Sequence, residues 1–207
     1  MIERYKRRDL VLFLGIFTTS HAHITLFPLH PRKEKGPHNI MATRTIHLIS
    51  FRNSSSQRAH FAIFVPSAAD PKRGTLIHAV GAPMAGYILE FKRNYSPAMT
   101  QQRHETFPIG QVYSSNIVDS VDTAMTKDST PRGKIEIAAS QVPTPGISQN
   151  FMAPVNDTTN KRCQEWTMDF VHHLVSNGLI TAEAIQIVQS KRDPPNHGIG
   201  LQPAGRR

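Results

Sequence analysis

The chain has a single cysteine, Cys163, and the segment around it favours a nucleophilic thiol. Residues 161–177 read as an amphipathic helix, so Cys163 falls in the first turn. There the unpaired backbone N–H groups and the helix dipole favour a thiolate over a thiol. Lys161 and Arg162 act in the same direction, and Glu165 acts against it. We therefore expect a depressed pKa for the Cys163 thiol and reactivity below the pH at which a free thiol titrates.

The sequence contains a capping signal for each end of this predicted helix. Asn160 can cap the start with its side-chain oxygen, and Gly178 suits the left-handed position that ends a helix. At about 100° per residue, Cys163 projects onto the same half as the apolar side chains, which are Trp166, Phe170, Val171, Leu174 and Val175. The helix alone permits two interpretations, a nucleophile or a small core residue, because free cysteine is often buried and reactivity needs a partner base.

Two histidines on neighbouring strand candidates could supply that base. His60 opens the segment 60–65, and His78 lies near the end of the segment 75–80. If these segments form a hairpin, the two imidazoles come close on one face. A thiol nucleophile needs a base within hydrogen-bond reach, and the base needs an orienting group. Cys163, His60 and His78 can fill these three catalytic roles. The alternative is that each histidine is an ordinary surface or hydrogen-bonded residue.

The residues around these three positions resemble the permuted papain-like fold. The similarity rests on His-Phe-Ala-Ile-Phe-Val, then Leu-Ile-His on the next strand, then Arg-Cys-Gln-Glu-Trp opening a helix about a hundred residues later. The best-known members are lecithin:retinol acyltransferase and its relatives, together with the related permuted deubiquitinating peptidases. In these proteins the histidine strand precedes the cysteine helix. The resemblance implies that Cys163 is the nucleophile, His60 the base and His78 the group that orients it.

The similarity covers Thr45 to Gly178, with departures. Arg162 and Gln164 flank the cysteine, where the acyltransferases have an Asn-Cys-Glu-type context, and no membrane-anchoring helix follows. The resemblance implies a thiol-dependent hydrolase or acyltransferase that forms an acyl-enzyme on Cys163 from an amide, isopeptide or ester. The alternative is a catalytically inactive binding module on the same fold.

The chain also resembles small fungal proteins of unassigned function. This similarity is carried by Pro66, by Gly74-Thr75-Leu76-Ile77-His78 and by Arg162-Cys163-Gln164-Glu165-Trp166.

Strand-like segments precede helix-like ones, which predicts an α+β fold with an antiparallel β-sheet packed against a C-terminal helix pair. The strand candidates are residues 45–51, 60–65, 75–80, 87–92 and 109–113. Short connections between the early strands indicate an antiparallel meander. A second helix is expected at about residues 182–190. Weaker patterns suggest a helix at 117–125 and a short strand at 134–138, and Glu90, Lys92 and Arg93 are expected on a solvated strand edge.

The net charge of +9 lies mostly in the ends of the chain. Residues 1–40 carry +4 and residues 191–207 carry +3, whereas the long middle, residues 41–190, carries only +2. This distribution does not support a basic groove, so we expect no specific nucleic-acid partner. One cysteine excludes an internal disulfide and an all-cysteine zinc site. We expect a monomer that needs neither a metal nor another cofactor.

The composition divides the chain into three parts. We expect residues 1–41 to form an N-terminal extension that is either disordered or a signal segment, residues 42–193 a single α+β domain, and residues 194–207 a flexible C-terminal tail. In residues 1–22 the cluster Lys6-Arg7-Arg8 precedes an apolar run that is too short to span a bilayer, and a sequence that loosely resembles a cleavage site follows. Glu3 and Asp9 weaken this signal, so we expect a cytoplasmic protein, or a secreted one if residues 1–22 act as a signal peptide. No transmembrane segment is expected.

Overall fold

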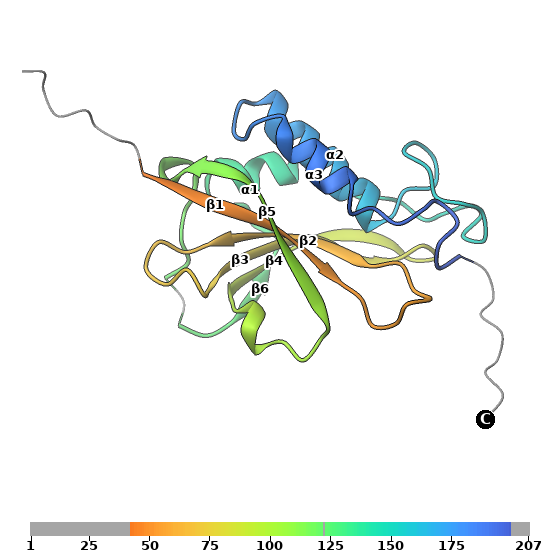
Figure 1. The fold of residues 1–207 in the computed structure, drawn as a ribbon, viewed down its shortest axis with the longest axis horizontal. Helices are drawn as coiled ribbons and strands as arrows, with labels where there is room; N and C mark the ends of the chain where they lie inside the picture. The colour runs from red at the N-terminus through yellow and green to blue at the C-terminus, as the bar shows by residue number, and fades with distance from the viewer. Residues whose placement is uncertain (1–41, 122, 200–207) are drawn as a thin grey trace, which may run out of the picture. The chain divides into compact units, whose positions relative to one another are not determined.

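The computed structural model describes residues 42–121 and 123–199. The predicted N-terminal extension and signal segment, and the end of the predicted tail, lie outside the described residues. Within them, a six-stranded antiparallel sheet is covered on one face by helices (Figure 1). The predicted α+β class is confirmed.

The strands form a meander that is extended at both edges. Their order across the sheet is β5-β1-β2-β3-β4-β6, so the first four strands lie side by side in chain order. The bounds are β1 Thr43–Phe51, β2 His60–Pro66, β3 Gly74–Ala82, β4 Gly86–Tyr95, β5 His104–Tyr113 and β6 Thr126–Asp128. The first five strands were predicted within a few residues, except that β5 begins earlier, and β6 was missed.

Helices α2 and α3 were predicted, and α1 was not. The helices are α1 Gly133–Ser140, α2 Cys163–Ser176 and α3 Glu183–Gln189, with short 3-10 turns η1 Pro97–Met99 and η2 Ser114–Asn116. The strand predicted at residues 134–138 is wrong, because this segment is α1. The helix predicted at 117–125 is also wrong, since only the turn η2 precedes an irregular segment there.

The main core lies between the sheet and the helices. Trp166, Phe170 and Leu174 of α2 are fully buried there against inward-facing residues of the strands, such as Phe61 and Ile77. A smaller apolar cluster covers the other face and consists of Ile49, Phe51, Ala62, Phe64, Leu76 and Tyr95. Because side chains alternate along a strand, the odd-numbered residues of β2 face the helices and the even-numbered ones face the smaller cluster.

The ends of α2 show why it begins at the cysteine. The predicted cap, Asn160, is wrong: the capping position is Arg162, whose backbone N–H donates to the Glu165 carboxylate at 3.1 Å. Asn160 instead is buried and donates to the carbonyls of Ala153 and Pro154, which holds the preceding loop. At the other end Gly178 has φ 65°, as predicted, and the N–H groups of residues 178 and 179 close a Schellman motif.

Arg93 was predicted on a solvated strand edge, and its observed position is very different. Its side chain is completely buried, donates through Nε and an Nη atom to both carboxylate oxygens of Asp128, and also donates to Glu136 of α1. The prediction that Arg93 lies on a solvated edge is therefore wrong. The cluster ties β4 and the edge strand β6 to α1, because only paired charges are tolerated at this depth.

The start of the predicted flexible tail contacts the domain. The carbonyl of Pro194 accepts from Arg58 at 2.8 Å, that of Pro195 accepts from the Val155 N–H at 2.9 Å, and His197 lies 3.0 Å from an Arg52 nitrogen. None of the helices in the described ranges is long and apolar enough to span a membrane.

Candidate active site

Strands β2 and β3 bring His60 and His78 together, as predicted. Their rings meet on the sheet face opposite the helices, with Nε2 of His60 and Nδ1 of His78 2.8 Å apart. Ile63 pairs with Ile77 in the ladder, so the two histidines are diagonal cross-strand neighbours on one face. Phe51 stacks on the His60 ring at 6.1 Å between centroids. The two imidazoles therefore occupy fixed positions.

Glu90 of β4 extends this pair into a chain of three groups. It lies directly across from His78 in the β3–β4 ladder, and its carboxylate is 3.1 Å from Nε2 of His78. Lys92 and Lys127 lie 3.9 and 3.5 Å from the same carboxylate. The sequence placed Glu90 on a solvated edge, which missed its contact with a buried histidine.

The hydrogen bonds in this chain can be assigned from its carboxylate end. An ionised carboxylate only accepts, so Nε2 of His78 carries the hydrogen and its Nδ1 is an acceptor. The Nε2 atom of His60 must then be the donor to that Nδ1 atom. A neutral imidazole has one N–H group, so the Nδ1 atom of His60 is left with a free lone pair. This is the atom that a general base requires.

Both imidazoles are neutral at pH 7. Burial lowers the pKa of His60 to about 4, and the nearby Lys92 contributes in the same direction. Burial also lowers the pKa of His78 to about 2, with smaller contributions from His60, Lys92 and Lys127. The folded chain thus holds two bases that it does not protonate under ordinary conditions.

These lowered pKa values predict a loss of stability in acid. Between the ordinary histidine pKa of 6.5 and about 4, the unfolded chain binds a proton that folded His60 does not. Stability is therefore fully present above pH 6.5 and falls as the pH is lowered through this window, by at most about 3 kcal/mol for His60. Urea unfolding between pH 4 and 7 measures this slope. His60→Gln should flatten it, while the exposed His172→Gln should leave it unchanged; equal slopes in all three proteins would contradict the assignment.

Cys163 is the first residue of α2 and lies against the start of β2. Its Sγ atom is 3.8 Å from the carbonyl oxygen of Ala59, and the thiol is half-buried. The β2–β3 ladder pairs residues 63–66 with residues 74–77, so it does not include the first residues of β2. The sulfur thus lies next to the beginning of β2, which is not paired with β3. Both residues belong to the described part of the chain, and no hydrogen bond links the Cys163 thiol to the His60 ring.

One cavity of about 260 Å³ is lined by both Cys163 and His60. Tyr87 also lines it, and burial next to Cys163 raises the pKa of its phenol, which therefore stays a protonated donor. Gly81 forms part of the wall with φ 153°, and a Cβ atom there would lie 2.1 Å from the Gly86 carbonyl oxygen. The lining residues are Gln57, Arg58, Ala59, His60, Gly81, Tyr87, Arg162, Cys163 and Gly198.

The predicted depression of the thiol pKa is wrong in direction. Burial raises the pKa of Cys163, and the charge of Glu165 adds to this effect. The Phe61 and Gln164 backbone N–H groups and Arg58 lower it, but they do not outweigh burial. The resting site therefore holds a neutral thiol beside a neutral imidazole, in place of the expected ion pair.

The residues after Cys163 fix the start of α2 rather than facing a substrate. The Gln164 amide donates to Ala59 and Asp193, and its oxygen accepts from Arg58 and from the Asp193 N–H. All its hydrogen-bonding capacity is used by the protein. Donors that could stabilise charge on a bound carbonyl include the N–H groups of the first helical turn, which lack intrahelical partners, and the Tyr87 hydroxyl.

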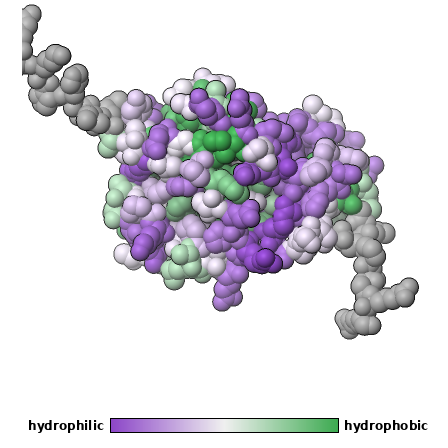
Figure 2. All heavy atoms as spheres, in the orientation of Figure 1, coloured by the Kyte–Doolittle hydropathy of each residue, from purple (hydrophilic) through white to green (hydrophobic). Residues whose placement is uncertain are grey.

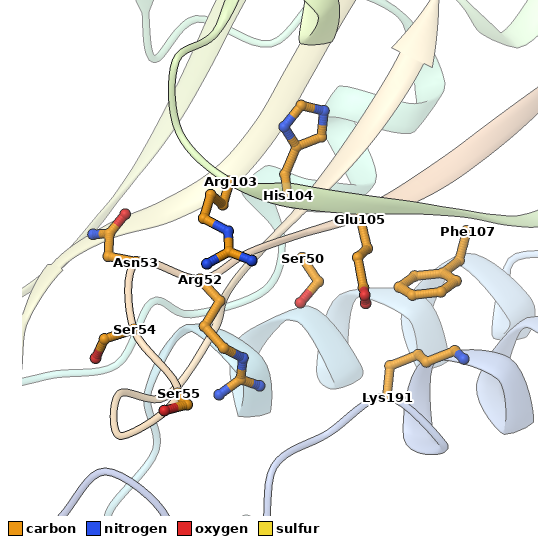
Figure 3. Close-up of a pocket in the computed structure, with 10 residues that line it drawn as sticks. All are labelled: Ser50, Arg52, Asn53, Ser54, Ser55, Arg103, His104, Glu105, Phe107 and Lys191. Carbon is orange, nitrogen blue, oxygen red and sulfur yellow. The ribbon is translucent and has the colours of Figure 1, made fainter.

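A larger cavity of about 390 Å³ lies elsewhere, between the ends of β1 and β5 and the segment after α3 (Figure 3). It contains several serines, but Figure 3 shows the His104 ring pointing away from them, and that ring instead contacts Phe51 on the other face at 5.7 Å. The lining of this cavity includes three positively charged side chains, Arg52, Arg103 and Lys191, and one negatively charged side chain, Glu105. No nucleophile and base converge among these lining residues.

The comparisons with known proteins give one result. A family of unknown function, DUF6540, matches residues 46–181, which is more than half of the chain. The chain belongs to this family. The matched span includes His60, His78, Glu90, Tyr87 and Cys163, so these candidate residues lie inside the family's domain. No curated protein and no solved structure matches the chain.

Proposed function

We propose that this DUF6540 domain is a thiol-dependent hydrolase or acyltransferase with a permuted papain-like arrangement. The observation that carries the proposal is the Glu90–His78–His60 chain, which ends in the cavity that also contains Cys163. The order of the elements supports it, because two histidine strands precede the cysteine helix. A partly exposed carboxylate that fixes two tautomers in series has the role of an orienting group in nucleophilic catalysis.

The raised thiol pKa makes His60 a general base in this proposal. Sγ of Cys163 attacks the carbonyl carbon of an amide, isopeptide or ester as its proton moves to Nδ1 of His60. The C–N or C–O bond then breaks, and the leaving group takes that proton. Water hydrolyses the thioester by the same route in reverse, which releases the acid and restores the thiol. An alcohol or amine in place of water gives acyl transfer. His78 and Glu90 stabilise the positive charge that His60 acquires.

The test uses the fact that the chain has one cysteine. Wild-type protein mixed with 4-nitrophenyl acetate should release one equivalent of nitrophenol in a burst and gain one acetyl group by intact mass, since acylation precedes a slower hydrolysis. Cys163→Ala should show neither effect while keeping its circular dichroism spectrum. A wild-type thiol that reacts only in denaturant would contradict the proposal.

A binding role without chemistry is the second candidate, and two observations favour it. The thiol pKa is raised, and His60, with a pKa of about 4, is a weak base at neutral pH. On this alternative the same cavity binds a ligand reversibly. The acylation experiment separates the two functions, because a binding module gives no covalent acetyl group.

Glu90→Gln should slow acylation by about tenfold, which is less than the 10²–10⁴-fold that a general base supplies. The reason is that the glutamine amide can both donate and accept, so it no longer fixes the His78 tautomer. Nitrogen-15 NMR of the imidazoles should show the changed tautomer directly. Glu105→Gln, which removes the same charge from an exposed position of β5, is the control. Equal rates for the two variants would show that Glu90 does not orient the base.

A further inference from the structure

Two arginines form part of the wall of the cavity that Cys163 lines. Arg162 directly precedes Cys163, and Arg58 directly precedes Ala59, whose carbonyl contacts the sulfur. An acyl group attached to Cys163 would lie in the cavity whose wall includes both arginines. Neither arginine belongs to the predicted catalytic set.

Each of these arginines keeps a donor without a partner. The terminal nitrogens of Arg58 donate to Gln164, Glu165 and the Pro194 carbonyl, but its buried Nε atom has no hydrogen-bond partner in the described part of the chain. The Arg58 side chain is only 7% exposed. Arg162 donates from a terminal nitrogen to the Phe151 carbonyl, and its Nε atom is equally buried and unmatched. Unmatched buried donors cost free energy that a ligand acceptor can recover.

The charges around the cavity do not balance. The buried Glu165 carboxylate is shared by Arg58 and Arg192 and also accepts the Arg162 N–H. No carboxylate of the described ranges lies within ion-pair distance of the Arg162 guanidinium. The beginning of α2 adds partial positive charge, and His60 and His78 are uncharged. The wall beside the thiol therefore carries excess positive charge.

We propose that the acyl group accepted by Cys163 ends in a carboxylate. This inference rests on the proposed function and specifies its substrate class as a half-ester, half-thioester or half-amide of a dicarboxylic acid. Arg162 binds the free carboxylate by charge-assisted hydrogen bonds, and the Nε atom of Arg58 supplies a second donor. A cavity of about 260 Å³ fits a short chain, such as a succinyl or glutaryl group.

The test compares two alkylating reagents of similar size, of which one carries a negative charge. Iodoacetate carries a carboxylate, and iodoacetamide carries an amide on the same carbon skeleton. In both cases the sulfur forms the S–C bond, iodide leaves and the thiol proton goes to solvent. The rate ratio, iodoacetate over iodoacetamide, should be about tenfold higher for Cys163 than for N-acetylcysteine, as expected of one hydrogen bond to a charged group. Arg162→Gln should remove this preference, and Arg162→Lys should keep most of it.

Lys161→Gln is the matched control, because it removes one positive charge from the neighbouring residue, whose ammonium is already paired with Asp169 at 2.6 Å. Its rate ratio should equal that of the wild type. A wild-type ratio no higher than that of N-acetylcysteine, or an equal drop for Lys161→Gln and Arg162→Gln, overturns the carboxylate assignment and leaves the thiol chemistry intact. Failure of both reagents to label the folded protein overturns the proposed function and this inference together.

Discussion

His60→Ala should lower the rate of acylation of Cys163 by 10²–10⁴-fold, the usual contribution of a general base. The expectation is large because the thiol pKa is raised by burial, so the attack needs a group that removes the proton. Added imidazole should restore part of the rate, since removal of the ring opens space next to the sulfur. The measurement is the first-order rate of the nitrophenol burst, with and without imidazole.

The pH profile gives this prediction a second readout. The base works only when neutral, and burial lowers the His60 pKa to about 4. The acylation rate of the wild-type protein should therefore fall in acid near pH 4, well below the ordinary histidine pKa of 6.5. His172→Ala, which removes an exposed histidine of α2, is the matched control and should have the wild-type rate and profile. An acid limb at pH 6.5, or equal rates for the two variants, would show that His60 is not the base.

The sequence was informative where one local pattern decided the structure. The apolar segments predicted β2 and β3, and their antiparallel pairing was enough to bring His60 to His78. The same reasoning could have found Glu90. The Gly81–Gly86 turn centres the β3–β4 hairpin, and counting outward from it places Glu90 opposite His78. The signal was present in the register of the hairpin, which is fixed by its turn.

Other features depend on tertiary contacts that no local pattern contains. The thiol pKa was predicted from the helix start and the neighbouring cations, but burial against β2 dominates and reverses the direction. Gln164 and Glu165 are completely buried because Arg58 and Asp193, far away in the sequence, meet them there. Segment 134–138 has strand-like composition, yet it forms α1 because Ile135 and Ala139 pack into the main core.

Arg93→Met should destabilise the fold by about 3–5 kcal/mol, the range observed when one partner of a buried ion pair is removed. Arg93 is fully buried, its guanidinium carbon lies 4.7 Å from the Phe91 ring centroid, and it forms ion pairs with Asp128 and Glu136. Glu136 is the critical partner, because its side chain is only 5% exposed and would be left charged without its main donor. Urea unfolding at pH 7 measures the loss.

The proton balance of Glu136 distinguishes an unpaired charge from simple loss of packing. Burial already raises the pKa of Glu136, and Arg93 opposes that shift. Without Arg93 the folded state should bind a proton more tightly than the unfolded chain, so part of the lost stability returns as the pH is lowered from 7 to 5. Arg93→Met combined with Glu136→Leu should recover most of the lost stability at pH 7, since an apolar pair needs no compensating charge.

Lys92→Met, on the partly exposed face of the same strand, is the control and should cost under about 1 kcal/mol. If Arg93→Met and Lys92→Met cost the same, or the double variant is no more stable than Arg93→Met alone, the ion cluster does not hold β4 and β6 to α1.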